Sequence, residues 1–170
     1  MTLDQLNRLA EAAARAELAR CCGARRWIDR MCAARPFGDR GALLAAAERA
    51  FEGLGRADWL EAFGHHPRIG DLASLRAKYA STAAWAGEEQ RGTADAGESA
   101  LAALAEGNRA YEERFGYIFI VCATGKSADE MLALLRARMP NPPEREIRIA
   151  VEEQMKITRL RLEKLLDSPA

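Results

Sequence analysis

The sequence predicts an all-α fold: a single compact bundle of seven or eight helices with one short extended segment. Hydrophobic residues make up 49% of the 170 residues but aromatic residues only 6%, so the core has to be built mainly from Leu, Ala, Ile and Val. Alanine is the strongest helix former, and the β-branched residues that sheets favour are sparse. We therefore expect residues 1–170 to form one helical domain, long enough to bury its own core.

The first third of the chain contains start and stop signals for three helices. Residues 2–5, Thr-Leu-Asp-Gln, form a capping box that opens a helix, which we expect to end near Gly23. A second, short helix carries Trp27 and stops before Pro36, because proline disfavours helical backbone in the residue that precedes it. Asp39 caps a third helix with an apolar face.

The middle of the chain alternates helical patterns with glycine-rich turns. A short apolar segment at 59–63 leads into a structured turn at 64–71, which contains two glycines and a proline. Residues 72–86 are again helix-like, and a further helix over 101–115 ends at Gly116. Between these helices we expect glycines to loosen the chain, at Gly87, Gly92 and Gly97.

The last third of the chain contains one strand-like run and two more helices. Residues 117–122 have the length and character of a buried strand but no second run to pair with, so we expect an isolated extended segment. A second capping box at 127–130 opens a helix through Met139. Asn141 caps the last helix, with proline in its first position, and this helix runs to about Leu166.

Composition and charge argue against several kinds of partner. The 25 basic and 25 acidic residues give a formal net charge of zero, which does not favour nucleic acid. No apolar run has the roughly 18 residues of a membrane helix, and no signal peptide is apparent. We therefore expect a cytoplasmic protein in which the cysteines are reduced. The four cysteines form no CxxC pair and are Cys21, Cys22, Cys32 and Cys122.

The only two histidines, His65 and His66, lie together in the turn at 64–71, a common setting for a catalytic group. Spacing alone favours a structural role, in which one histidine caps a helix or fills a packing gap. A metal site is not expected, because adjacent side chains do not normally converge on one ion and no cluster of cysteines or carboxylates accompanies them.

A second candidate, Arg161, shares a helical face with Ile157 and Leu165 and should therefore be largely buried. A buried guanidinium needs either a protein carboxylate or a bound anion. A structural salt bridge, or an arginine whose head group reaches out to solvent, explains the same pattern. Taken alone, Glu88 and Glu89 look like an ordinary charged helix end.

Several segments, in this order and over nearly the whole chain, resemble the family of 2-oxo-4-hydroxy-4-carboxy-5-ureidoimidazoline (OHCU) decarboxylases. The turn His66-Pro67-Arg68-Ile69-Gly70-Asp71 is the most distinctive of them. The other matching segments are residues 35–37, 59–63, 89–90, 115–122 and 157–162.

The resemblance implies a cofactor-free, all-α carboxy-lyase of purine and urate breakdown that converts its ureido-imidazoline substrate to (S)-allantoin and CO₂. It also implies a possible homodimer. Family members often have serine three residues before the catalytic glutamate, where this chain has Ala86. The implied catalytic residues are His66 and Glu89, and the implied substrate-binding residues are Pro67, Gln90, Phe119, Val121 and Arg161.

Two other functions stay open at this level. One is a non-catalytic helical module of the same fold that binds a ureide or a protein partner, which the Ala86 departure favours. The other is a hydrolase acting on a related ureide, which would need an activated water and usually a metal. An unrelated helical scaffold protein would place His66 and Arg161 far apart in space.

Overall fold

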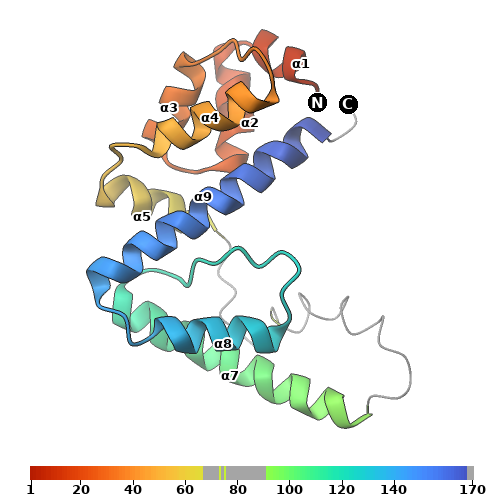
Figure 1. Ribbon diagram of the computed structural model, residues 1–170, viewed down its shortest axis with the longest axis vertical. Coiled ribbons are helices and arrows are strands. Elements are labelled where there is room, and N and C mark those ends of the chain that lie inside the picture. The colour runs from red at the N-terminus through yellow and green to blue at the C-terminus, as the bar shows by residue number, and fades with distance from the viewer. Residues whose placement is uncertain (67–72, 74, 76–90, 168–170) are drawn as a thin grey trace. The chain divides into compact units, whose positions relative to one another are not determined.

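The computed structural model describes residues 1–66, 73, 75 and 91–167, and all regular secondary structure in them is α-helical (Figure 1). This confirms the predicted all-α fold, and the predicted helix over 72–86 lies almost entirely outside the described residues. The eight helices of the described residues are α1 (Leu3–Arg8), α2 (Glu11–Cys21), α3 (Arg25–Ala33), α4 (Arg40–Phe51), α5 (Arg56–Gly64), α7 (Arg91–Phe115), α8 (Ala128–Arg138) and α9 (Pro143–Asp167).

The chain groups into two compact units, and each is described by itself. Unit 1 consists of Met1–His66, Ile120–Cys122 and Ala150–Ala170, and unit 2 consists of Pro67–Phe119 and Ala123–Ile149. Helix α9, which has 25 residues, contributes its first turns to unit 2 and the rest to unit 1. The prediction that residues 1–170 form one domain stays a prediction.

Helix α3 organises the core of unit 1, because it contacts α2, α4 and α5. Its buried side chains are Trp27, Ile28 and Met31. The Trp27 indole Nε1 also donates a hydrogen bond of 3.1 Å to the Ala47 carbonyl on α4. This bond satisfies the polar atom of a fully buried ring and fixes the position of α4 against α3.

The N-terminal helix differs from its prediction. Thr2 and Gln5 form the expected capping box, but the helix breaks at Leu9 and Ala10, whose ψ angles are 140° and 150°. The Arg35 guanidinium donates to the carbonyls of Leu6 and Leu9, at 3.1 and 2.9 Å. A distant side chain thus binds carbonyls at the C-terminal end of α1, where intrahelical donors run out. Helix α2 then ends at Cys21, with Cys22 as its cap residue, close to the predicted end near Gly23.

Some of the other predicted helix ends are confirmed and some are wrong. Asp39 and Ser127 cap α4 and α8 as expected, and Gly116 ends α7 with a φ of +79°. Gly92 and Gly97 do not loosen the chain, because both lie within α7. Asn141 is not the cap of α9, which begins at Pro143. Its amide instead donates a 2.8 Å hydrogen bond to the Glu146 carboxylate, an acceptor that the prediction did not consider.

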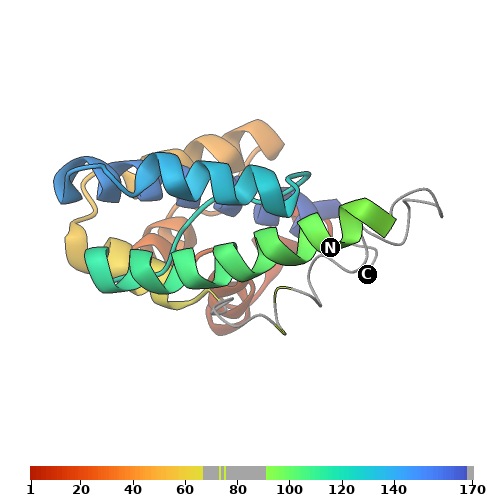
Figure 2. The same cartoon turned by 90° about the horizontal axis from the view of Figure 1, so that it is seen from below.

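In unit 2, α7 and α8 lie side by side in both views (Figures 1 and 2). Gly107 permits close packing there, because a Cβ at this position would lie 2.8 Å from a methyl carbon of Leu135. The fully buried Glu146 carboxylate accepts a 2.7 Å hydrogen bond from Arg138 Nε and another from the Tyr111 hydroxyl. We call Tyr111, Arg138, Asn141 and Glu146 the Glu146 cluster.

Residues 117–122 form neither helix nor strand, in agreement with the isolated non-helical segment predicted there. The described helices include none that is both long enough and apolar enough to span a lipid bilayer.

Candidate active site

His66 directly follows the C-terminal end of α5, in unit 1. Its backbone N–H donates to the Phe63 carbonyl at 3.1 Å, so the last turn of the helix fixes the backbone that carries the side chain. Phe63 itself is 1% exposed and anchors this turn in the interior. The imidazole therefore lies at a helix end and is half-buried.

Both ring nitrogens of His66 contact side chains of α9. Nε2 lies 2.6 Å from Oε1 of Gln154, and Nδ1 lies 3.4 Å from Nη2 of Arg161. The structure therefore brings together the two candidate residues that the sequence singles out on chemical grounds, although 95 positions separate them. An unrelated scaffold gives no reason for this proximity.

Helix α9 presents these contacts from a single face. Gln154, Thr158 and Arg161 follow one another at spacings of four and three residues, which places them above one another on a helix. Gln154 and Thr158 are each 1% exposed, and Gln154 Nε2 donates to Thr158 Oγ1 at 3.2 Å. Buried polar groups are normally hydrogen-bonded, and the His66 ring provides the partner of the Gln154 amide oxygen.

Arg161 is half-buried, close to its prediction. Its Nη1 donates to the Cys21 carbonyl at 3.4 Å, and its Nη2 faces His66. Within the described part of the chain the guanidinium contacts a carbonyl and an imidazole, both at long distances, and forms no ion pair. A guanidinium in this state retains hydrogen-bonding capacity for an anion or a carbonyl oxygen.

The surroundings of His66 lower its pKa below the usual 6.5. Burial is the main cause, because it disfavours the charged imidazolium, and the positive charge of Arg161 acts in the same direction. The hydrogen bond to Gln154 opposes them. The ring is therefore neutral near pH 7 and can accept a proton.

The thiols of Cys21 and Cys22, near Arg161, are held in the protonated form. Burial raises the pKa of the Cys21 thiol to about 12 and that of Cys22 to about 11. Both are therefore protonated at neutral pH, unlike a nucleophilic cysteine. Cys21, Cys22 and Cys32 are free thiols.

The remaining candidates lie in different parts of the structure. Val121 belongs to unit 1, where the next residue, Cys122, donates its backbone N–H to the Glu153 carboxylate at 2.7 Å. Phe119 belongs to unit 2, where the Arg138 guanidinium lies over its ring at 4.7 Å. Three predicted site residues lie outside the described residues, as does Ala86: Pro67, Glu89 and Gln90.

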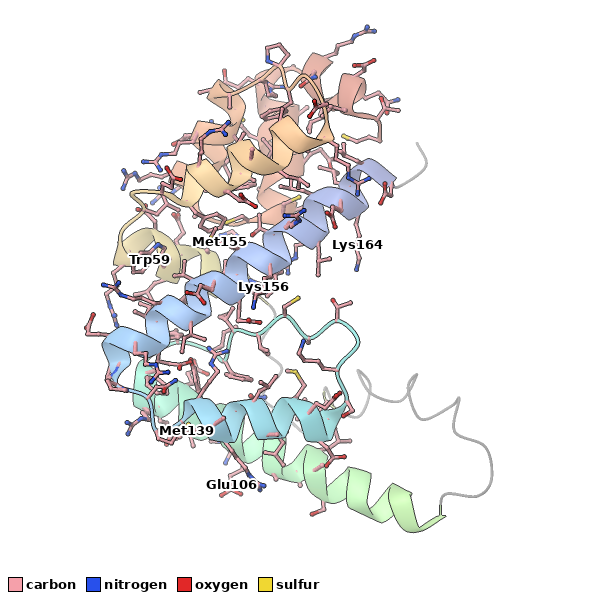
Figure 3. The ribbon with its side chains drawn as sticks, in the orientation of Figure 1. Trp59, Glu106, Met139, Met155, Lys156 and Lys164 are labelled. Carbon is pink, nitrogen blue, oxygen red and sulfur yellow. The ribbon has the colours of Figure 1, made fainter. Side chains whose placement is uncertain are left out.

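Sequence reasoning missed Glu153, Gln154 and Thr158. A signal for two of them was present, because Gln154 and Thr158 lie seven and three residues before Arg161 and share its helical face. Figure 3 shows the neighbouring Met155 and Lys156 on α9. Met155 packs against the core of unit 1, whereas Lys156 forms an ion pair with Glu153.

Comparison with known proteins identifies the family. The sequence profile of the OHCU decarboxylases matches residues 7–163. The chain belongs to the OHCU decarboxylase family. The match includes every residue of the His66–Gln154–Arg161 arrangement, so the contacts described above lie within the family domain.

Relatives from three organisms align with the chain. The chain is 39% identical over 150 residues to the uric acid degradation bifunctional protein TTL of Arabidopsis thaliana, covering 88% of this chain and 46% of that protein. It is 40% identical over 76 residues to an OHCU decarboxylase of Amia calva, covering 45% and 42% of the two chains. An OHCU decarboxylase of Haloferax volcanii is 27% identical over 164 residues, covering 95% and 94%. The chain therefore aligns with less than half the length of the first two relatives.

Solved structures show the same fold. A crystal structure of OHCU decarboxylase in the presence of (S)-allantoin matches with a TM-score of 0.71 and 36% identity, covering 89% of this chain and 98% of that one. A crystal structure of (S)-allantoin synthase matches with a TM-score of 0.69 and 19% identity, covering 99% and 55%, and this second likeness shows the fold alone.

Proposed function

We propose that this protein decarboxylates 2-oxo-4-hydroxy-4-carboxy-5-ureidoimidazoline to (S)-allantoin and CO₂ in urate catabolism, as a carbon–carbon lyase that needs no cofactor. The observation that carries the proposal is the 3.4 Å contact between His66 and Arg161 in a chain of the OHCU decarboxylase family. A base and an anion-binding group thus share one site.

The chemistry of the substrate fits these two groups. One ring carbon carries both a carboxylate and a hydroxyl group and lies next to an imine carbon. When the bond to the carboxylate breaks, its electron pair moves into the imine, so the ring itself accepts the electrons. The protein then has to bind an anion, move a proton and orient the ring so that only one face is protonated.

Each of these tasks has a candidate residue. Arg161 binds the anionic or carbonyl oxygens of the substrate through charge-assisted hydrogen bonds. His66, which is neutral near pH 7, takes and returns the proton. Glu89 acts with it, either on the ureido N–H groups or on the imidazole. Substrate binding by Pro67 and Gln90, and by backbone groups at Phe119 and Val121, rests on the family resemblance.

A decarboxylation assay tests the proposal. The unstable substrate is generated from urate with urate oxidase and hydroxyisourate hydrolase, and its decay and the circular dichroism of the product are followed. We expect faster decay with one enantiomer of allantoin, and a loss of about 10²–10⁴-fold in the His66→Gln variant. His65→Gln is the matched control, because His65 is the adjacent, exposed histidine, and it should retain activity.

Decay no faster than without protein would contradict the proposal. If (S)-allantoin still bound in that case, the chain would be the non-catalytic ureide-binding module. Stoichiometric zinc or manganese needed for turnover would instead favour the hydrolase.

We further propose a cytoplasmic location and a homodimer, with no nucleic-acid or membrane partner. The free thiols of Cys21, Cys22 and Cys32 support a reducing compartment. Sedimentation equilibrium measures the oligomeric state, and a monomer would contradict the dimer.

A further inference from the structure

We propose that Gln154 is a positioning residue that holds His66 in the tautomer protonated on Nε2, which makes Nδ1 the nitrogen that exchanges a proton with the substrate. The first half of this inference rests on contacts in unit 1 alone. The second half rests on the proposed function.

The contact with Arg161 determines which nitrogen has the lone pair. A guanidinium has only N–H donors and cannot accept a hydrogen bond. Nη2 of Arg161 therefore donates to Nδ1 of His66, and Nδ1 must be unprotonated for that contact to form. In a neutral imidazole the proton then lies on Nε2.

The contact with Gln154 leads independently to the same tautomer. Gln154 Nε2 donates to Thr158 Oγ1, so the amide oxygen faces the imidazole, at 2.6 Å from Nε2 of His66. An amide oxygen only accepts, so the imidazole Nε2 must carry the proton that it donates. The Thr158 hydroxyl is buried and also forms a hydrogen bond with Cys22. This second contact holds the hydroxyl that accepts from the Gln154 amide.

The two nitrogens consequently have different roles. Nε2 is occupied by a glutamine that is 1% exposed, in the interior of unit 1. Nδ1 faces Arg161, the residue proposed to bind the substrate's oxygens, across a long contact that an incoming anion can replace. A substrate held by Arg161 therefore lies on the Nδ1 side of the ring. Among the described residues, the charged or titratable groups that face the ring are Arg161 on α9 and His65 beside it.

Nuclear magnetic resonance of ¹⁵N-histidine-labelled protein tests the tautomer directly. The chain has only two histidines, so the signals of His66 are those that disappear in the His66→Gln variant. Above the pKa of His66 we expect Nδ1 to show the shift of an unprotonated ring nitrogen and Nε2 that of a protonated one. In Gln154→Ala we expect both shifts to move toward the average of the two tautomers. The opposite assignment in the wild type, or unchanged shifts in Gln154→Ala, would overturn the proposal.

Activity of the same variants tests the consequence for catalysis. We expect Gln154→Ala to lower kcat by about five- to tenfold, the worth of one hydrogen bond, with a smaller effect on KM. Gln154→Glu also accepts from Nε2 and should restore the tautomer. Because its negative charge favours the imidazolium, the acid limb of its pH–rate profile should move to higher pH.

A control separates positioning from damage to the fold. Leu162 lies on α9 and is fully buried in the core of unit 1, so Leu162→Ala should lower stability while leaving the tautomer of His66 unchanged. An averaged tautomer in Leu162→Ala would show that any loosening of α9 produces the effect, and would overturn the specific role of Gln154. The histidine shifts do not depend on turnover. A protein without decarboxylase activity but with the expected shifts would therefore disprove the proposed function and not the positioning by Gln154.

Discussion

At the scale of single residues, opposing influences act on the pKa of His66. Burial and the positive charge of Arg161 lower its pKa, whereas the Gln154 hydrogen bond raises it. The net shift of the pKa is downward, so the His66 imidazole stays neutral to a lower pH than the imidazole of an exposed histidine would.

The first prediction concerns pH and activity. Since the proposed mechanism needs neutral His66, kcat/KM should fall on acidification with an apparent pKa below 6.5. Arg161→Gln removes one cause of the downward shift, so an NMR titration of His66 in this variant should give a higher pKa than in the wild type. A pKa for the variant at or below that of the wild type would contradict the assignment of this cause.

The second prediction concerns pH and stability. Between the lowered pKa of folded His66 and its unfolded value of about 6.5, the unfolded chain binds more protons than the folded chain. The free energy of unfolding should therefore decrease as the pH falls through this window, and His66→Gln should lose that part of the decrease. Urea unfolding on both sides of pH ~6.5 measures it. The same pH dependence in the variant and the wild type would assign the effect to other groups.

At the scale of elements, the link between α2 and α3 contacts the histidine pair. Gly23 lies in this link, and a Cβ built there would be 2.0 Å from Cγ and 2.5 Å from Cβ of His65. Because the second contact is to an atom next to the backbone, the histidine cannot avoid it by a simple rotation. Glycine thus permits the link to approach the residue that precedes His66.

The third prediction follows from that close approach. Gly23→Ala should destabilise the protein by about 1–3 kcal/mol, as overpacking does, and should lower activity by displacing the backbone at His66. Gly38→Ala is the control, because no atom lies within 4 Å of a Cβ at that position. Urea unfolding and the decarboxylation assay measure both variants. Equal stability of the two would show that the His65 side chain yields without cost.

The Glu146 cluster determines how the end of α8 and the start of α9 pack within unit 2. Arg138, which is 7% exposed, pairs with a carboxylate that is fully buried. Such a pair stabilises little relative to an apolar pair, but removing one member leaves an uncompensated charge.

The fourth prediction is a double-mutant cycle on that pair. Arg138→Met should destabilise by about 3–5 kcal/mol. Arg138→Met combined with Glu146→Leu should be less destabilising than the sum of the two single variants, because no charge is then left without its partner. Urea unfolding of the four proteins measures the cycle, and additive effects would mean that the pair is not coupled.

These elements also show what sequence can and cannot predict. The caps at Thr2, Asp39 and Ser127 were predictable because a cap depends on residues within one turn. The break at Leu9 was not, because the Arg35 side chain that binds its carbonyl lies 26 residues away. Likewise His66 and Arg161 could be proposed from their chemistry and the family resemblance. Their contact and the role of Gln154 could not, because both depend on how α5 and α9 pack.

At the scale of the whole molecule, one helix belongs to both compact units. The first turns of α9 carry Glu146 in unit 2, and its later turns carry Gln154 and Arg161 in unit 1. Because a continuous helix transmits loss of structure along its hydrogen bonds, we expect the two units to unfold together.

The fifth prediction tests this coupling. Trp27 and Trp59 lie in unit 1, so fluorescence of a Trp85→Phe variant reports on unit 1 alone. Adding Arg138→Met, a change in unit 2, should lower the urea midpoint seen by fluorescence as much as the midpoint seen by far-ultraviolet circular dichroism. A fluorescence midpoint that did not move would indicate two independently folding domains and contradict the single-domain prediction.

The face of α9 that carries Gln154, Thr158 and Arg161 also limits how this protein can change during evolution. Each residue of a helix is turned by about 100° from the previous one. Inserting or deleting one residue between Gln154 and Arg161 would therefore turn one of them away from His66, even if every side chain kept its identity. Exposed positions of this stretch are free to vary in sequence, whereas its length is not. Descendants of this gene that keep the function should differ here by substitution and never by a gap.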